Sequence, residues 1–285
     1  MELGVQFFLT GLFKKLVVAD RLALFVDPVF KNPEQFGSGA IWLATLAYAV
    51  QIYCDFSGYS DMALGLAHLL GFHLARNFDR PFLAANLAEF WRRWHISLSS
   101  WLRDYVFLPL GGSRCGRWKT YRNVLLVMTL AGLWHGAGWN YVLFGVAQGL
   151  LLVVHRIFRE WCETKPRLHA ALQSAPGWAL RVVVTFTSFI LTLVIFRTTS
   201  LAMTGTMLKR MLWPTDGASV PLLPLGLYVT LIAVVIGHIL GAPGRALRLW
   251  QWLPRPVRGV AFGGALTLAM VLAPPVSRVF VYFQF

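Results

Sequence analysis

Charged residues, and acidic ones above all, are scarce in this chain. Its 285 residues include 12 Asp or Glu and 26 Lys or Arg, so charged side chains make up only 13%. Soluble domains carry about 25% charged residues. The shortage excludes an ordinary soluble domain. With 57% hydrophobic residues and a mean hydropathy of +0.59, the composition predicts an all-α, polytopic membrane protein.

Several other signals are missing as well. Cys54, Cys115 and Cys162 are odd in number and have no CxxC spacing, so neither a disulfide framework nor a cysteine metal site is indicated. There is no HExxH motif, and the two histidines discussed below are far apart in the chain, so we expect no metal. The first basic pair follows an apolar run instead of preceding one, which is not the pattern of a secretory signal.

The net charge of +14 suggests an anionic binding partner, either nucleic acid or the headgroups of anionic lipids. The basic residues fall in short gaps between apolar runs, which favours lipid headgroups and the positive-inside rule over nucleic acid. We therefore predict no nucleic-acid partner. Two basic segments, Ser113–Asn123 and Arg156–Arg181, are predicted to be cytoplasmic loops.

The apolar runs predict the helices. A first helix over 5–30 is interrupted by charge, and a second run over 41–53 resumes at 62–72 after CDFSGYSDMALG. The apolar run over 124–154 contains three glycines around His135 and is too long for one span, so we expect a break there. Further helices are predicted over 182–196, 199–213, 222–240 and 260–273, with a basic segment over 245–258.

The polar residues Asp55, Ser57, Tyr59 and Asp61 interrupt the second apolar run. Carboxylates at membrane depth are costly, so they should face protein or water. Two interpretations stay open. Ser60 or Asp61 could cap a following helix, or the group could line a substrate channel.

The stretch from Glu89 to Gly112, EFWRRWHISLSSWLRDYVFLPLGG, carries a lone histidine among tryptophans and arginines. At helical spacing His95 shares one face with Trp91, Leu98 and Leu102. A core histidine is the simpler interpretation. His135 in GLWHGAGWN is a second histidine of this kind, and an imidazole at membrane depth is a candidate proton acceptor.

These motifs, together with YCDFSGYSDMALGLAHLLGF, GLFKKLVVADRLALFVDPVF, VIFRTTS and the terminal FVYFQF, resemble the membrane-bound O-acyltransferase (MBOAT) superfamily. Within it they are similar to the bacterial alginate O-acetyltransferase group. The resemblance covers nearly the whole chain. It implies an MBOAT-type helical ring with re-entrant or interfacial helices, in the cell inner membrane.

The resemblance also implies roles. His135 maps onto the family's principal active-site histidine, as a base or a transient acyl carrier, and His95 onto its second motif histidine, which would orient a substrate or shuttle a proton. The donor would be acetyl-coenzyme A or another acyl thioester, with no bound metal or prosthetic group. The acetyl group would reach an exopolysaccharide through an extracytoplasmic partner protein. Further candidates for a channel or structural role are Asp55, Ser57, Tyr59, Asp61, Trp94, Arg103, Asp104, Trp134 and Asn140.

Members of this group are longer at the amino-terminal side, and a Phe-Pro and Gly-Pro-Ile element expected upstream is absent. We therefore expect residues 1–285 to be the carboxy-terminal portion of a single integral membrane domain. Two alternatives remain. One is an inactive fragment or scaffold, and the other is an ion- or proton-coupled transporter that uses the intramembrane Asp and His residues.

Overall fold

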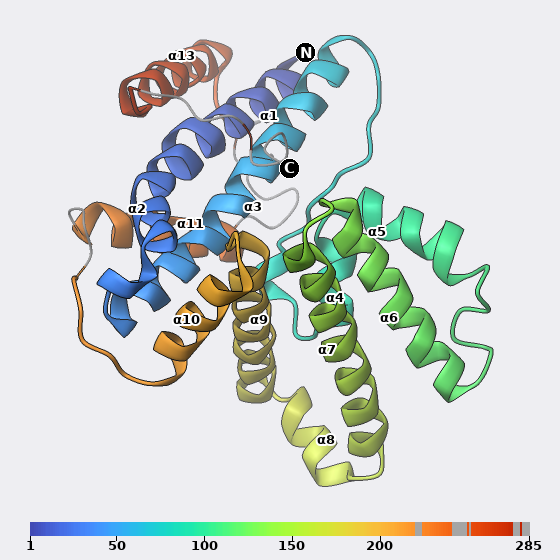
Figure 1. The fold of residues 1–285 in the computed structure, drawn as a ribbon. Coiled ribbons are helices and arrows are strands. Elements are labelled where there is room, and N and C mark those ends of the chain that lie inside the picture. The colour runs from blue at the N-terminus through green and yellow to red at the C-terminus, as the bar shows by residue number, and fades with distance from the viewer. Residues whose placement is uncertain (220–223, 241–249, 251, 276–279, 281–285) are drawn as a thin grey trace. The chain divides into compact units, whose positions relative to one another are not determined.

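The computed structural model describes residues 1–219, 224–240, 250, 252–275 and 280 (Figure 1). Its contacts divide the chain into two compact units, each described by itself below. Unit 1 comprises Met1–Arg76 with Arg210–Phe285, and unit 2 comprises Asn77–Lys209. The prediction of one domain over 1–285 stays a prediction. The terminal FVYFQF and the start of the basic segment 245–258 lie largely outside the described residues.

Unit 1 begins with one long helical path. Helix α1 (Glu2–Phe13) continues through a π-helical segment, η1 (Lys14–Ala19), into α2 (Asp20–Lys31). The predicted charge interruption is therefore a change of helical pitch and not a break. Short π segments inside α-helices are uncommon and occur often at functional sites. A 3-10 turn, η2 (Pro33–Gln35), follows α2.

Helix α3 (Ser38–Leu69) runs unbroken through the segment predicted to interrupt it. The capping interpretation of Ser60 and Asp61 is therefore wrong, because both lie inside the helix. Glycines let α3 approach α1 very closely. A Cβ atom on Gly11 would lie 2.4 Å from the Gly58 carbonyl oxygen, and one on Gly65 would lie 2.6 Å from that of Gly4. Only glycine permits such a backbone contact.

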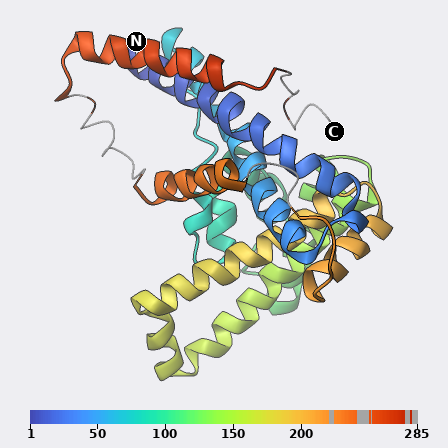
Figure 2. The same cartoon turned by 90° about the vertical axis from the view of Figure 1, so that its left-hand side faces the viewer.

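The carboxy-terminal part of unit 1 contains α11 (Pro224–Leu240) and α13 (Arg255–Leu272). Helix α13 packs along α1, and Figure 2 shows the red α13 beside the blue α1. These helices confirm the predicted helices at 222–240 and 260–273 for the residues that the structure describes.

Unit 2 starts with an irregular stretch and is helical thereafter. Its elements are η3 (Pro81–Leu83), α4 (Leu87–Arg93), α5 (Ile96–Leu102), the π-helical η4 (Arg103–Phe107), α6 (Arg117–Trp134), α7 (Trp139–Glu163), α8 (Pro166–Gln173), α9 (Ala175–Arg197) and most of α10 (Leu201–Leu212). Helices α6 and α7 form an antiparallel hairpin, and α8 joins α7 to α9 (Figure 1).

Of three sequence predictions for unit 2, one is confirmed and two are wrong. The break at His135 is confirmed, because α6 ends at Trp134 and α7 begins at Trp139. The helical face predicted to join His95 to Trp91, Leu98 and Leu102 is wrong, since α4 ends at Arg93 and α5 begins at Ile96. The second basic loop is also wrong as a loop, because the end of α7, α8 and the start of α9 occupy it. Its arginines lie on these helices instead.

Four helices among the described residues are long and apolar enough to cross a membrane. They are α3, α7, α9 and α13, and α11 is a shorter apolar helix. A hydrocarbon core of about 30 Å needs about 20 apolar residues in a helix. The prediction of a polytopic, all-helical membrane protein is confirmed.

The cytoplasmic placement of Ser113–Asn123 can be tested with a native cysteine. Cys115 is partly exposed, whereas Cys54 and Cys162 are buried and can be replaced by alanine. Because basic residues flank Cys115 on both sides, a membrane-impermeant maleimide added to intact cells should leave it unlabelled. Labelling should appear once the cells are permeabilised. Rapid labelling of intact cells would show that this segment faces outward.

Candidate active site

His95 lies in the short break between α4 and α5, in a strained conformation. Its φ is 45° and its ψ is 55°, in the left-handed region. A non-glycine residue there costs about 1–3 kcal/mol and persists only where the surrounding structure enforces it. The side chain is nevertheless buried, with 7% of the residue exposed. The strained backbone at His95 lowers the stability of the fold, and it accompanies the burial of the imidazole.

Asn77, which precedes α4 in the sequence, caps the first turn of α5. Its carbonyl oxygen accepts the Ile96 N–H at 3.0 Å, and its side-chain oxygen accepts the Ser97 N–H at 3.1 Å and the Ser97 hydroxyl at 2.6 Å. First-turn N–H groups of a helix lack partners within it. Since Asn77 satisfies two of them, the His95 side chain is released from any capping role. Its Nδ1 lies 3.5 Å from the Ser97 hydroxyl.

His135 ends α6 in the tight turn to α7. Its N–H donates to the Gly132 carbonyl at 3.0 Å. A Cβ atom on Gly132 would lie 2.1 Å from the Tyr141 carbonyl oxygen, and one on Gly136, whose φ is 158°, would lie 2.6 Å from the Tyr141 ring. The two glycines thus permit a turn too tight for any other residue. It buries His135, which is 8% exposed.

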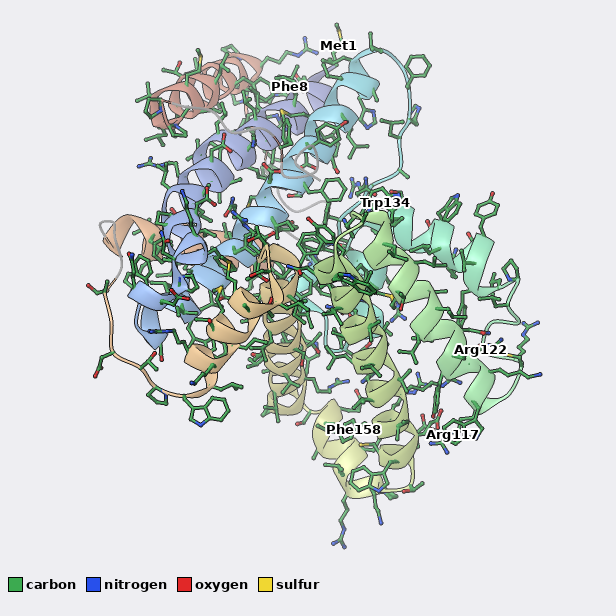
Figure 3. All side chains as sticks on the ribbon, viewed as in Figure 1. Met1, Phe8, Arg117, Arg122, Trp134 and Phe158 are labelled. Atoms are coloured by element: carbon green, nitrogen blue, oxygen red, sulfur yellow. The ribbon has the colours of Figure 1, made fainter. Side chains whose placement is uncertain are left out.

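Aromatic rings connect the two imidazoles. The Trp134 ring lies 5.6 Å from that of His95 and 5.1 Å from that of His135, edge-on in both cases. Phe196 of α9 closes the other side of His135 at 5.1 Å, also edge-on. Figure 3 labels Trp134 at one end of α6 and Arg117 at the other. Trp134 is itself more than half exposed, so this end of the hairpin is open to surrounding molecules.

Both histidines lie outside the four candidate spans, and burial sets their protonation. Burial lowers the pKa of His95 to about 4. Burial, and to a smaller extent charge on His95, lower the pKa of His135 to about 3. The two rings are therefore within electrostatic range of each other. At neutral pH both are uncharged, and a neutral imidazole has a lone pair that can accept a proton.

These shifts predict a loss of stability in acid. Histidines in the unfolded chain have a pKa near 6.5, so below that pH the unfolded state binds protons that the folded state does not. Stability should fall by about 1.4 kcal/mol per pH unit for each histidine as the pH drops toward about 4. The measurement is the free energy of unfolding at pH 7 and pH 5. The double variant His95→Gln/His135→Gln should show a shallower pH slope, and an equal slope would contradict the assignment.

The other predicted residues of unit 2 have different surroundings. Trp94 is buried in an aromatic cluster and stacks on Phe90 at 5.6 Å. The Asn140 side chain donates to the Thr198 carbonyl, which joins the start of α7 to the end of α9. Arg103 and Asp104 are exposed and pair with each other at 2.7 Å, and this hydrogen bond lowers the pKa of Asp104. Their position favours a surface role over a channel role.

The predicted polar group of unit 1 forms an ion-pair network with η1 and α2. Lys15 Nζ lies 2.7 Å from Asp55 Oδ1 and 2.8 Å from Asp20 Oδ1, and Lys14 Nζ lies 2.6 Å from Asp61 Oδ2. Ser57 is buried. Tyr59 is 42% exposed, and its ring lies 5.2 Å from that of Phe280. The two carboxylates of α3 thus face protein, as predicted.

Sequence reasoning missed several residues of these sites. Lys14 and Lys15 interrupt an apolar run in the sequence, but nothing in the sequence pairs them with α3. Gln148 lies inside an apolar run, where an uncharged amide is itself a signal of a polar contact. Within the described residues, no group of three or more His, Cys, Asp or Glu is placed to hold a metal ion.

Comparison with known proteins decides the family. The model of the membrane-bound O-acyltransferase family, MBOAT, matches residues 2–198, which include both histidines and both lysines of η1. The chain belongs to this family. The predicted recognition and the MBOAT fold class are therefore confirmed, and the protein is a multi-pass membrane protein.

The chain is also similar to individual proteins named for the transfer of an acetyl or D-alanyl group. The chain is 44% identical over 206 residues to "Probable alginate O-acetylase AlgI" of Pseudomonas syringae pv. tomato, covering 72% of this chain and 37% of the relative. It is 39% identical to "Peptidoglycan O-acetyltransferase" of Helicobacter pylori, covering 74% and 39%. It is 33% identical to "Teichoic acid D-alanyltransferase" of Streptococcus thermophilus, covering 69% and 51%. The matches thus span about two fifths to one half of these relatives.

Proposed function

We propose that this MBOAT protein transfers an acetyl group from a cytoplasmic thioester donor, across the membrane, to hydroxyl groups of an exopolysaccharide. The observation that carries the proposal is the pair of buried, uncharged imidazoles of His95 and His135, whose ring centroids lie 5.6 Å and 5.1 Å from the Trp134 ring. Both lie within the residues that match the family.

The geometry supports general acid–base catalysis by His135. Its imidazole would take the proton of the acceptor hydroxyl as that oxygen attacks the thioester carbonyl carbon. The carbon–sulfur bond then breaks, and the departing thiolate receives the proton from the imidazolium. An alternative is that His135 carries the acyl group transiently on a ring nitrogen. His95, within electrostatic range, would orient a substrate or shuttle a proton.

The relatives support the substrate class. The alginate O-acetylase and the peptidoglycan O-acetyltransferase are both named for acetylating a polysaccharide-containing polymer at oxygen. We propose the same for this chain in the cell inner membrane, with an alginate-like exopolysaccharide as the acceptor. An extracytoplasmic protein would pass the acetyl group on. In unit 1 the carboxylates of α3 pair with lysines of η1, which favours a structural role over ion transport.

Membrane vesicles with radiolabelled acetyl-coenzyme A test the proposal. Vesicles from cells with the intact chromosomal gene, which keeps the protein at its native length, should incorporate label into polymer-bound esters released by mild base. Vesicles from a deletion strain are the control. Equal incorporation by the two would contradict the proposed function, and label in a non-polysaccharide acceptor would correct the substrate class.

A further inference from the structure

The side chain of Gln148 connects three helices of unit 2. Gln148 lies in α7 and has no exposed surface. The Trp91 indole N–H of α4 donates to Gln148 Oε1 at 3.2 Å, and Gln148 Nε2 donates to the Thr192 hydroxyl of α9 at 2.6 Å. The Thr192 hydroxyl in turn donates to the Phe189 carbonyl at 2.7 Å. One amide thus completes a chain of three hydrogen bonds.

The direction of this chain is determined by its ends. An indole nitrogen is only a donor, so the amide oxygen must face Trp91 and the amide nitrogen must face Thr192. The Thr192 hydroxyl uses its single proton on the Phe189 carbonyl and accepts from Gln148. No other arrangement of the Gln148 amide satisfies all members. This series of hydrogen bonds therefore specifies one relative placement of α4, α7 and α9.

Each of these helices leads to one of the two histidines. Helix α4 ends at Arg93, just before His95, and α7 begins directly after the turn that carries His135. Helix α9 carries Phe196, one turn beyond Thr192, and its ring lies 5.1 Å from that of His135. We propose that Gln148 is a positioning residue that sets the spacing of the His95 and His135 imidazoles by tying these three helices together.

The physical reason is the directionality of hydrogen bonds. Apolar side chains pack without a strong directional preference, so helices held by them alone can slide by a fraction of a turn. A misplacement of about 1 Å at a reacting group costs about 10²-fold in rate. The consequence for acyl transfer rests on the proposed function, whereas the effect on the histidines themselves does not.

Histidine reactivity measures this placement without any transfer assay. The full chain in membrane vesicles is treated with diethyl pyrocarbonate, and mass spectrometry follows modification of His95 and His135. Gln148→Leu should speed modification of at least one of the two by about tenfold, because it leaves buried polar partners unsatisfied and loosens the helices. Gln148→His should restore slow modification, since imidazole can accept from Trp91 and donate to Thr192.

A triple variant separates positioning from a purely structural role. Trp91→Phe/Gln148→Leu/Thr192→Val removes all three polar side chains of this hydrogen-bond series, so none of their polar atoms is left buried without a partner. Its thermal stability should return toward that of the parent, while modification of the histidines stays fast. Acetyl transfer in vesicles from cells that carry the triple variant in the chromosome should stay about tenfold below the parental rate. Thr185→Val is the matched control, because the Thr185 hydroxyl bonds the Arg181 carbonyl of its own helix. It should behave as the parent.

Parental modification rates at both histidines in Gln148→Leu or in the triple variant would overturn the proposal. If the parent shows the expected labelling pattern but no acetyl transfer, the proposed function fails and the positioning role stands. The two inferences are thus tested separately.

Discussion

Replacing His135 by glutamine should lower acetyl transfer by about 10²–10⁴-fold, the usual contribution of a general acid–base group. His135 is the buried imidazole at the tip of the α6–α7 hairpin, and Trp134 and Phe196 enclose it. Glutamine retains a polar side chain of similar size but cannot accept a proton near neutral pH. The codon is changed in the chromosome, and ester formation on the polymer is measured in vesicles.

The matched control for this variant is His169→Gln. His169 lies on α8 and is exposed, so its loss should leave transfer at the parental level. Immunoblotting of the membranes checks that abundance is unchanged. Parental transfer by His135→Gln at equal abundance would remove His135 from the reaction and shift attention to His95. If His135→Gln lowers both acetyl transfer and protein abundance, the loss would be attributed to folding. His135→Asn would then be measured, because a variant of normal abundance that still lacks transfer separates catalysis from folding.

The largest effect on stability is expected from Lys15→Met. The Lys15 ammonium is buried and lies within 2.8 Å of a carboxylate oxygen of both Asp20 and Asp55. Removing one member of a buried ion pair costs about 3–5 kcal/mol, because the remaining charge stays buried without compensation. The free energy of unfolding in detergent, measured by titration with a denaturing detergent, should fall by about that amount.

Lys14→Met is the neighbouring control for this prediction. Its partner is Asp61, and the two side chains retain 26% and 19% exposure, so solvent replaces part of the lost interaction. We expect a clearly smaller loss of stability. The double variant Lys15→Met/Asp55→Asn should recover part of the loss, because it removes a carboxylate together with its cation. Equal losses for the two lysine variants would contradict the distinct burial that the structure assigns to them.

Apolar patterning of the sequence was enough for much of this fold. The helices at 182–196, 222–240 and 260–273 and the break at His135 were predicted from run length and glycine content. Such features are local: a span needs about 20 apolar residues in succession, and glycines mark a close turn. The family resemblance was also visible in the sequence, because each of the two motifs, one around His95 and one around His135, is a contiguous stretch of residues.

Tertiary structure alone decided how the polar residues are used. The sequence pattern placed His95 on a helical face, whereas Asn77 caps α5 from outside and holds His95 in the left-handed region. Likewise, Asp55 and Asp61 lie inside an unbroken helix, because lysines of η1 neutralise them.

The contacts responsible join residues far apart in the chain. Lys15 and Asp55 are separated by 40 positions, and Trp91 and Gln148 by 57. Hydrophobic periodicity reports only which side of an element is buried, and it holds no information about which distant polar group completes a hydrogen bond. A buried polar atom must find a partner wherever the fold brings one, and only the packed helices determine which residue that is.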